Sequence, residues 1–133
     1  MSALRRLPGG TPGTTCIVGA TTLGSPIATR PPDAAIPGAL SADVTVAVSS
    51  QGPCPGGLWA GVVTSNGGVS SVALGPYGST GYWGAVPGTD QAWDLGRHVV
   101  EIFAGSPAAG PLPSTTPLAV AVLCVEPSGT ASC

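Results

Sequence analysis

Apolar and polar residues alternate in short runs from residue 41 onward, and glycine, proline and asparagine separate the runs. The run SADVTVAVSS at 41–50 shows the pattern most clearly. Its residues Val44, Val46 and Val48 fall on one parity, and Asp43, alanine and hydroxyl-bearing residues fall on the other. Successive side chains of a strand point to opposite faces. The run therefore predicts a half-buried antiparallel strand whose valines face the core.

Further runs of strand length follow, and no segment of a dozen residues keeps a helical period without a break at glycine or proline. The Asn-Gly pair in SNGG is the strongest short-range signal for a hairpin. These features predict an all-β fold, an antiparallel β-sandwich of about seven strands. The last run is apolar on both faces, which indicates a central or doubly covered strand. The predicted strands are 15–22, 41–50, 58–64, 69–74, 82–86, 97–104 and 118–125.

The N-terminal 40 residues have a different character. The stretches LPGGTPGTT and RPPDAAIPG favour turns and polyproline-like backbone, and only the run at 15–22 has strand character. We therefore expect an extended arm over 1–40 and a sandwich domain over 41–133. A disordered tail is the alternative for the arm.

The chain carries very little charge, and this bears on what its surface contacts. Only 8% of its residues are Asp, Glu, Lys or Arg, and 43% are hydrophobic, whereas roughly 25% of a typical soluble domain is charged. An isolated monomer with this balance has poor colloidal stability. We therefore expect much of the surface to contact protein in the working state. A source organism that avoids lysine explains the absence of lysine but not the scarcity of glutamate.

The few charges are unevenly distributed. Residues 1–40 carry a formal charge of +2, from three arginines and one aspartate, and residues 41–133 carry −4, from one arginine and five acidic residues. A basic segment on an acidic body favours contact between the segment and a neighbouring subunit. The arginines are too few and too dispersed for a nucleic-acid surface. The arginines of the first segment are Arg5, Arg6 and Arg30.

Membrane and export signals are not expected from this sequence. The longest apolar run, at 118–125, has the length of a strand and is too short to span a membrane as a helix. The arginines near the N-terminus are not followed by the apolar stretch of a signal peptide. A longer leader that has been removed remains the alternative.

The cysteines are candidates for disulfide bonds. They form no C-x-x-C pair, and only one histidine is present, which argues against a zinc site. Two disulfides with three alternative connectivities are open, and buried free thiols are the other interpretation. The four positions are Cys16, Cys54, Cys124 and Cys133.

The segments ADVTVAVSS, AWDLGRHVVEIFAG and PLAVAVLCV together resemble an immunoglobulin-like or fibronectin-like sandwich over residues 41–126. In such domains a turn feeds the strand that crosses the core through a pattern of the form x-L-x-x-G-x-h-x-V-x-h. The aromatic residue usually found at the place of His98 is missing here. The resemblance implies architecture and no activity. The matching residues are Trp93, Leu95, Gly96, His98, Val100 and Ile102.

The single histidine is the first candidate for catalysis. Alternation places His98 on one face of its strand and Arg97 and Glu101 on the other, so His98 and Glu101 cannot act as a base and its orienting partner. We expect His98 to lie in the core or at a strand end. An aspartate from elsewhere beside His98 and an interface histidine are the alternatives. Any functional role of this strand is expected on the Arg97–Glu101 face, through contact.

Other patterns for chemistry are weak. Asp90 and Asp94 share one loop but lack the dense oxygen spacing of a calcium site, and capping a turn is the preferred interpretation. The sequence contains no phosphate-binding loop and no nucleophile elbow. We therefore expect no catalytic residue, no metal and no cofactor.

The aromatic residues divide into two groups. Trp59 and Trp93 are expected to fill the core. Tyr77, Tyr82 and Trp83 lie near turns, where exposed rings can stack on sugars or anchor a protein interface.

Three classes of function follow from these patterns. The favoured one is a structural assembly subunit in a virion, similar in type to phage capsid decoration (cement) proteins, with itself and a major shell protein as partners. A secreted or surface-displayed immunoglobulin-like module that binds carbohydrate or protein is the alternative, and an enzyme is the least favoured. The predicted interface residues are Arg5, Arg6, Ile17, Arg30, Tyr77, Tyr82, Trp83, Arg97 and Glu101.

Overall fold

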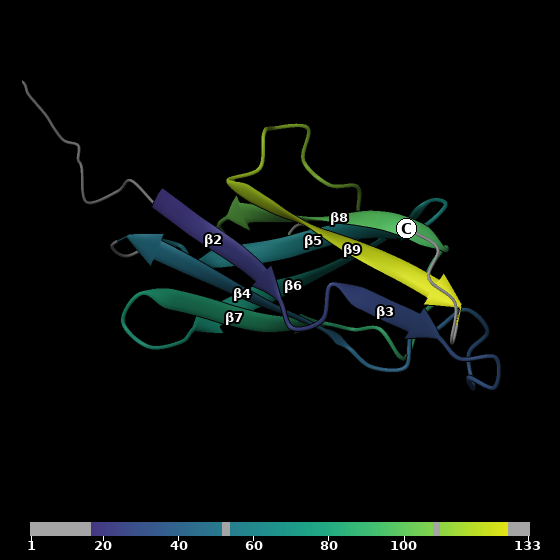
Figure 1. Ribbon diagram of the computed structural model, residues 1–133. Coiled ribbons are helices and arrows are strands. Elements are labelled where there is room, and N and C mark those ends of the chain that lie inside the picture. Colours follow the sequence, from purple (N-terminus) through teal and green to yellow (C-terminus); the bar gives the residue numbers. More distant parts are fainter. Residues whose placement is uncertain (1–16, 52–53, 108–109, 128–133) are drawn as a thin grey trace, which may run out of the picture.

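The computed structural model describes residues 17–51, 54–107 and 110–127, and this part of the chain is all-β. Eight strands form one mixed sheet in the order β2-β4-β7-β6-β5-β8-β9-β3 (Figure 1). No helix in these ranges is long and apolar enough to cross a membrane. The strands are β2 (Ile17–Leu23), β3 (Ile27–Arg30), β4 (Val44–Gln51), β5 (Leu58–Ser65), β6 (Gly68–Pro76), β7 (Gly81–Val86), β8 (Gly96–Ala104) and β9 (Ala119–Pro127).

The sheet curls strongly around its own core. β6 belongs to both halves, because most of its length pairs with β5 while Gly75 and Pro76 pair with β7. β2, at one edge of the sheet, consequently comes close to β9 near the other edge. Gly84 permits tight packing in β7, since a Cβ at this position would lie 2.7 Å from Leu74 Cδ2. The all-β prediction is confirmed, and the described strands form one mixed, strongly curled sheet.

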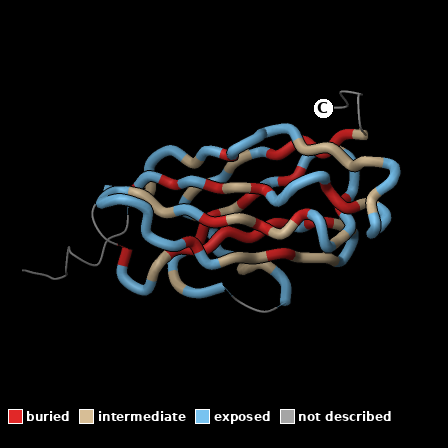
Figure 2. Tube along the Cα trace, turned by 90° about the horizontal axis from the view of Figure 1, so that it is seen from below, coloured by how far each residue is buried: buried red, intermediate tan, exposed pale blue. Residues whose placement is uncertain are grey.

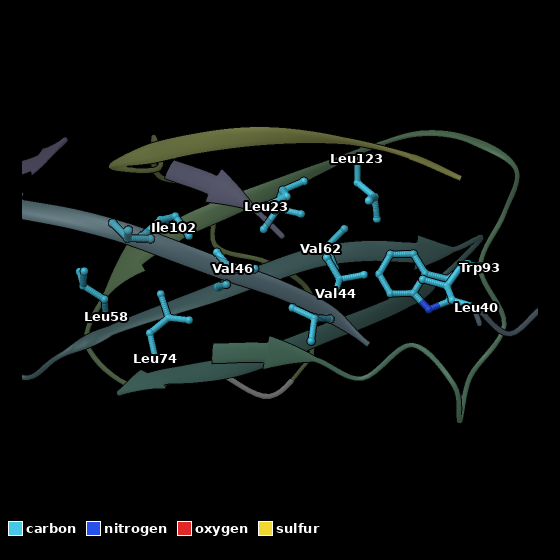
Figure 3. Close-up of a cluster of buried hydrophobic side chains, with 14 of the residues drawn as sticks. Leu23, Leu40, Val44, Val46, Leu58, Val62, Leu74, Trp93, Ile102 and Leu123 are labelled. Carbon is cyan, nitrogen blue, oxygen red and sulfur yellow. The ribbon is translucent and has the colours of Figure 1, made fainter. Parts of the chain in front are cut away.

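The core lies between the β2-β4-β7 half and the β5-β8-β9 half of the sheet. Inward side chains from both halves meet there, as Figure 3 shows for Val46 of β4, Val62 of β5 and Ile102 of β8. Buried positions follow the middle of the strands, and exposed positions follow the loops and outer faces (Figure 2). The alternation predicted for 41–50 is confirmed, since Val44, Val46 and Val48 are buried. Trp93 belongs to this core, as expected, whereas Trp59 is buried on the other face of β5 against Phe103.

The predicted hairpin at SNGG is present between β5 and β6. Ser65 pairs with Gly68 across the turn, and Gly67 has a φ of 80°. Glycine adopts this left-handed conformation without the steric cost of a Cβ, which is why Asn-Gly sequences favour such turns.

The segment expected to be an arm is part of the sheet as far as the structure describes it. β2 pairs antiparallel with β4, and β3 pairs parallel with β9. Leu23 and Leu40 are buried in the shared core. Residue 40 is therefore not the boundary of the folded body, and residues 1–16 lie outside the described ranges. A four-residue strand such as β3 is too short to show a pattern in the sequence, and its pairing depends on the free backbone groups of its neighbour.

The last strand is only partly as predicted. β9 lies between β8 and β3, so its place inside the sheet agrees with the expectation. Double coverage is wrong, because Val120 and Val122 on its outer face are about half exposed. The apolar residues on this face therefore remain available to solvent.

We predict that Leu40→Ala destabilises the protein far more than Ile36→Ala. Leu40 is fully buried, so its truncation should lower the free energy of unfolding by about 2–5 kcal/mol. Ile36 lies in the same segment but is exposed, and its truncation should cost about 0.5 kcal/mol or less. Urea unfolding followed by tryptophan fluorescence measures both. Equal small losses would contradict the assignment of this segment to the core.

Candidate functional site

A corner between the loop after β7 and the start of β8 is tied together by backbone hydrogen bonds. The Trp93 amide donates to the Gly38 carbonyl at 2.9 Å, and the Asp94 amide donates to the Thr64 carbonyl at 2.8 Å. The Arg30 guanidinium donates through Nη1 to the Trp93 carbonyl at 3.1 Å. Arg30, which the sequence suggested as an interface residue, therefore holds its own chain together at this point.

His98 completes this corner. The ring is only 7% exposed, with Nε2 2.6 Å from the Asp94 carbonyl oxygen and Nδ1 2.7 Å from the Val63 carbonyl oxygen. Carbonyl oxygens only accept, so a neutral ring can donate to one of them and a doubly protonated ring to both. The Trp93 ring packs edge-on against the imidazole at 5.3 Å. The expectation of a core or strand-end histidine is confirmed.

This geometry leaves His98 poorly suited to catalysis. A general base needs a ring nitrogen within reach of the proton that it removes. Both nitrogens of His98 face backbone carbonyls of the same chain. One carboxylate also has a structural partner, since Asp43 Oδ1 accepts a hydrogen bond from the Gly88 amide at 2.9 Å. Within the described ranges, no group of three or more His, Cys, Asp and Glu residues is placed to hold a metal ion.

The outer face of β5, β8 and β9 is apolar. We call Val63, Val99, Val120 and Val122 the valine face; their side chains are 50%, 45%, 51% and 48% exposed. Leu95 and Leu118 extend it, so six of the eleven large exposed hydrophobic residues in the described chain lie on this side. A cluster of this kind marks an interaction surface more strongly than scattered single residues do.

Arg97 and Glu101 are the charged residues of this face. They flank Val99 on the same side of β8, as the alternation predicted. A hollow of about 680 Å³ lies beside them, with Val63, Leu95 and Leu112 among its apolar lining residues. The predicted Arg97–Glu101 face therefore coincides with the valine face.

The loop after β8 limits the valine face on one side. Gly61 of β5 has no side chain, and Leu112 packs into the space where a Cβ would stand. Trp59 and Phe103 stack against each other, with ring centroids 4.7 Å apart, and both are buried. The exposed surface is thus confined to the part of the sheet around Val99.

The predicted aromatic residues lie on the other side of the molecule. Tyr77 is 73% exposed and Trp83 is 46% exposed. Tyr77 lines a shallow hollow of about 540 Å³ together with Tyr82, and Trp83 pairs with Ala47 beside it. Tyr82 is half-buried, and its hydroxyl accepts from the Cys54 amide at 3.3 Å.

The remaining predicted interface residues are scattered. Ile17 is about half exposed at the start of β2, a strand that does not form part of the valine face. Arg5 and Arg6 lie outside the described residues. The structure therefore brings together Arg97 with Glu101 in one half of the curled sheet, and Tyr77 with Tyr82 and Trp83 in the other half, on opposite sides of the molecule.

Cys54 and Cys124 both take part in disulfide bonds. They cannot be bonded to each other, because β8 separates them. Gly57 bonds both to the Cys54 carbonyl and to Gly105 just after the end of β8, whereas Cys124 pairs with Arg97 near the start of β8, roughly 23 Å away at 3.3 Å per residue. The free-thiol interpretation is wrong for both, and Cys16 and Cys133 lie outside the described residues. Glu126 Oε2 lies 3.5 Å from Cys124 Sγ, a contact without a hydrogen bond because a disulfide sulfur has no proton.

Comparison with protein-family models, with curated proteins and with solved structures gave no match to this chain. The sequence did not identify the valine face as a surface. Its signal was present, since both RHVVEIFA and LAVAVLCV carry valines on the parity that faces outward.

We predict that His98→Ala weakens the corner severely. The change removes the imidazole that lies between the Asp94 and Val63 carbonyls, and a buried carbonyl that loses its donor costs about 1–3 kcal/mol. The free energy of unfolding should fall by about 2–5 kcal/mol in total. Guanidinium unfolding provides the measurement, with Val99→Ala on the exposed face of the same strand as the control. Equal stability of the two variants would show that the corner contributes little.

Proposed function

We propose that this protein is a non-enzymatic structural subunit of a virion, of the capsid decoration (cement) type, that packs on neighbouring copies and on a major shell protein. The exposed valine face carries the proposal. A weakly charged protein with an apolar sheet face gains stability when that face is covered by protein. Assembly on a shell supplies such a cover in the working state.

The scarcity of charge supports the same function. The chain has only four arginines, no lysine and six acidic residues, so little of its surface is strongly hydrated. Within the described chain, Arg30 is bonded to the Trp93 carbonyl and Asp43 to the Gly88 amide. Ionisable groups used to fasten the fold are poor candidates for catalysis, and their scarcity favours a role in contact.

An immunoglobulin-like architecture is part of this proposal. In antibody-type domains a tyrosine near the start of one strand bonds back to the backbone a few residues upstream, at the corner that leads into that strand. His98 makes the equivalent bond to the Asp94 carbonyl, four residues upstream. The antiparallel β5-β8-β9 group, with β2 on β4 and β4 on β7 in the other half, is consistent with this architecture.

The alternative is a secreted or surface-displayed binding module. Its specific support is the exposed pair Tyr77 and Trp83 beside a shallow hollow whose rim is rich in small residues. Aromatic rings of this kind can stack on sugars or anchor a protein partner. The disulfide bonds of Cys54 and Cys124 favour an oxidising, extracellular location for this alternative.

We predict that the purified full chain assembles. Multi-angle light scattering should show a mass that rises with concentration, or the chain should co-sediment with a shell lattice. Deletion of residues 1–15 should weaken lattice binding, because it removes Arg5 and Arg6 while it keeps Cys16 and every described strand. A monomer at every concentration that binds no lattice would refute the proposal.

The alternative has its own test. A glycan array probed with the wild type and with Trp83→Ala should show binding that the variant loses, if the aromatic surface is the site. Val99→Ala is the control on the opposite face, at a similar exposed fraction. Array binding that is absent in the wild type, or unaffected in Trp83→Ala, counts against carbohydrate recognition.

A further inference from the structure

We infer that the valine face joins two copies of this chain about a two-fold axis that passes between their Val99 side chains. The inference rests on the proposed function, because it assigns the self-association of an assembly subunit to one surface. The occupant of the face is therefore a second copy, and the argument depends on the arrangement of its charges.

The two charged side chains of the face are placed symmetrically around its centre. Arg97 and Glu101 each lie two residues from Val99 on the same side of β8, at a distance of roughly 6.6 Å along the strand. They are the only accessible charged residues of β5, β8 and β9 in the described chain. Neither side chain has an ion-pair partner within the described part of its own copy.

This arrangement is complementary to itself in one orientation only. An axis that lies between two facing sheets and is perpendicular to β8 reverses the strand direction in the second copy. Arg97 of one copy then faces Glu101 of the other, and the same pair forms a second time on the far side of the axis. An axis parallel to β8 would instead set Arg97 against Arg97 and Glu101 against Glu101, which is unfavourable. The charges therefore select the antiparallel dimer, an isologous contact.

The apolar residues fit the same axis. Val122 of β9 is the cross-strand partner of Val99, so both lie near the centre of the contact. Val63 continues the apolar surface on the β5 side, where it lines the hollow with Val99. Face-to-face packing of these valines removes them from water, and the two ion pairs lie at the rim of the contact.

The size of the surface predicts a weak dimer. β8 and β9 have nine residues each and β5 has eight, so the outer side of the three strands measures at most about 30 by 14 Å, and the exposed part around Val99 is smaller. This places the contact among small, transient interfaces. We therefore expect a dimer that forms with a Kd in the micromolar range or weaker and that becomes persistent when a shell holds the copies close together.

Charge-reversal variants of the full chain test the inference, with the dimer Kd measured by sedimentation equilibrium. Arg97→Glu replaces two attractive pairs with two repulsive pairs and should raise the dimer Kd about tenfold, and Glu101→Arg should do the same. The double variant R97E/E101R exchanges the two charges and should restore the Kd to within about threefold of the wild type. Single variants without effect, or a double variant that stays weak, would overturn the inference.

A second pair of variants separates this face from the opposite one. Val99→Asp places a carboxylate at the centre of the contact and should raise the Kd about 30-fold or more. Trp83→Asp alters a residue of matching exposure on the other face and should leave the Kd unchanged. Circular dichroism and unfolding curves confirm that both variants are folded. A dimer that survives Val99→Asp, or that is lost in Trp83→Asp, contradicts the assignment.

The outcomes also distinguish this inference from the proposed function. A chain that binds the shell lattice equally well after Val99→Asp and Arg97→Glu, and that never dimerises, refutes the two-fold contact and leaves the decoration function standing. A dimer that responds to these variants as expected, in a chain that binds no lattice, supports the contact and refutes the decoration function.

Discussion

His98 joins three parts of the fold, because both of its ring nitrogens lie within hydrogen-bonding distance of backbone carbonyls. Its imidazole reaches the Val63 carbonyl of β5 and the Asp94 carbonyl of the preceding loop, while its own backbone belongs to β8. With His98 held inward, the period of the strand requires Arg97 and Val99 to point outward. The outward orientation of Arg97 and Val99 on the valine face thus follows from a buried corner.

The corner and the curled sheet together account for the composition of the chain. Both halves of the sheet contribute inward side chains to one core, which uses the apolar residues of one parity. The valines of β8 and β9 on the other parity have no partner layer and remain half exposed. Most of the large exposed hydrophobic residues are therefore concentrated on one face. The protein has few charged side chains to keep a face of this kind in solution.

Much of the fold was predictable because it depends on local patterns. The strand at 41–50, the hairpin at SNGG and the opposite orientations of His98 and Glu101 follow from period-two alternation and turn chemistry. The Arg97–Glu101 face of the candidate site followed from the same argument. The exposure of Val120 and Val122 could not be predicted, because the sequence of an apolar strand does not show whether one or both of its faces are covered.

The sequence by itself determined most of the segments that become strands and, within them, which side chains face inward, because both follow from local alternation. Only the tertiary structure decided that β2 and β3 enter the sheet, that β3 runs parallel to β9, and that β6 carries the sheet around its core. These features depend on backbone groups brought together from distant parts of the chain. Their pairing leaves no periodic trace in the residues, because a backbone amide and carbonyl are the same at almost every position.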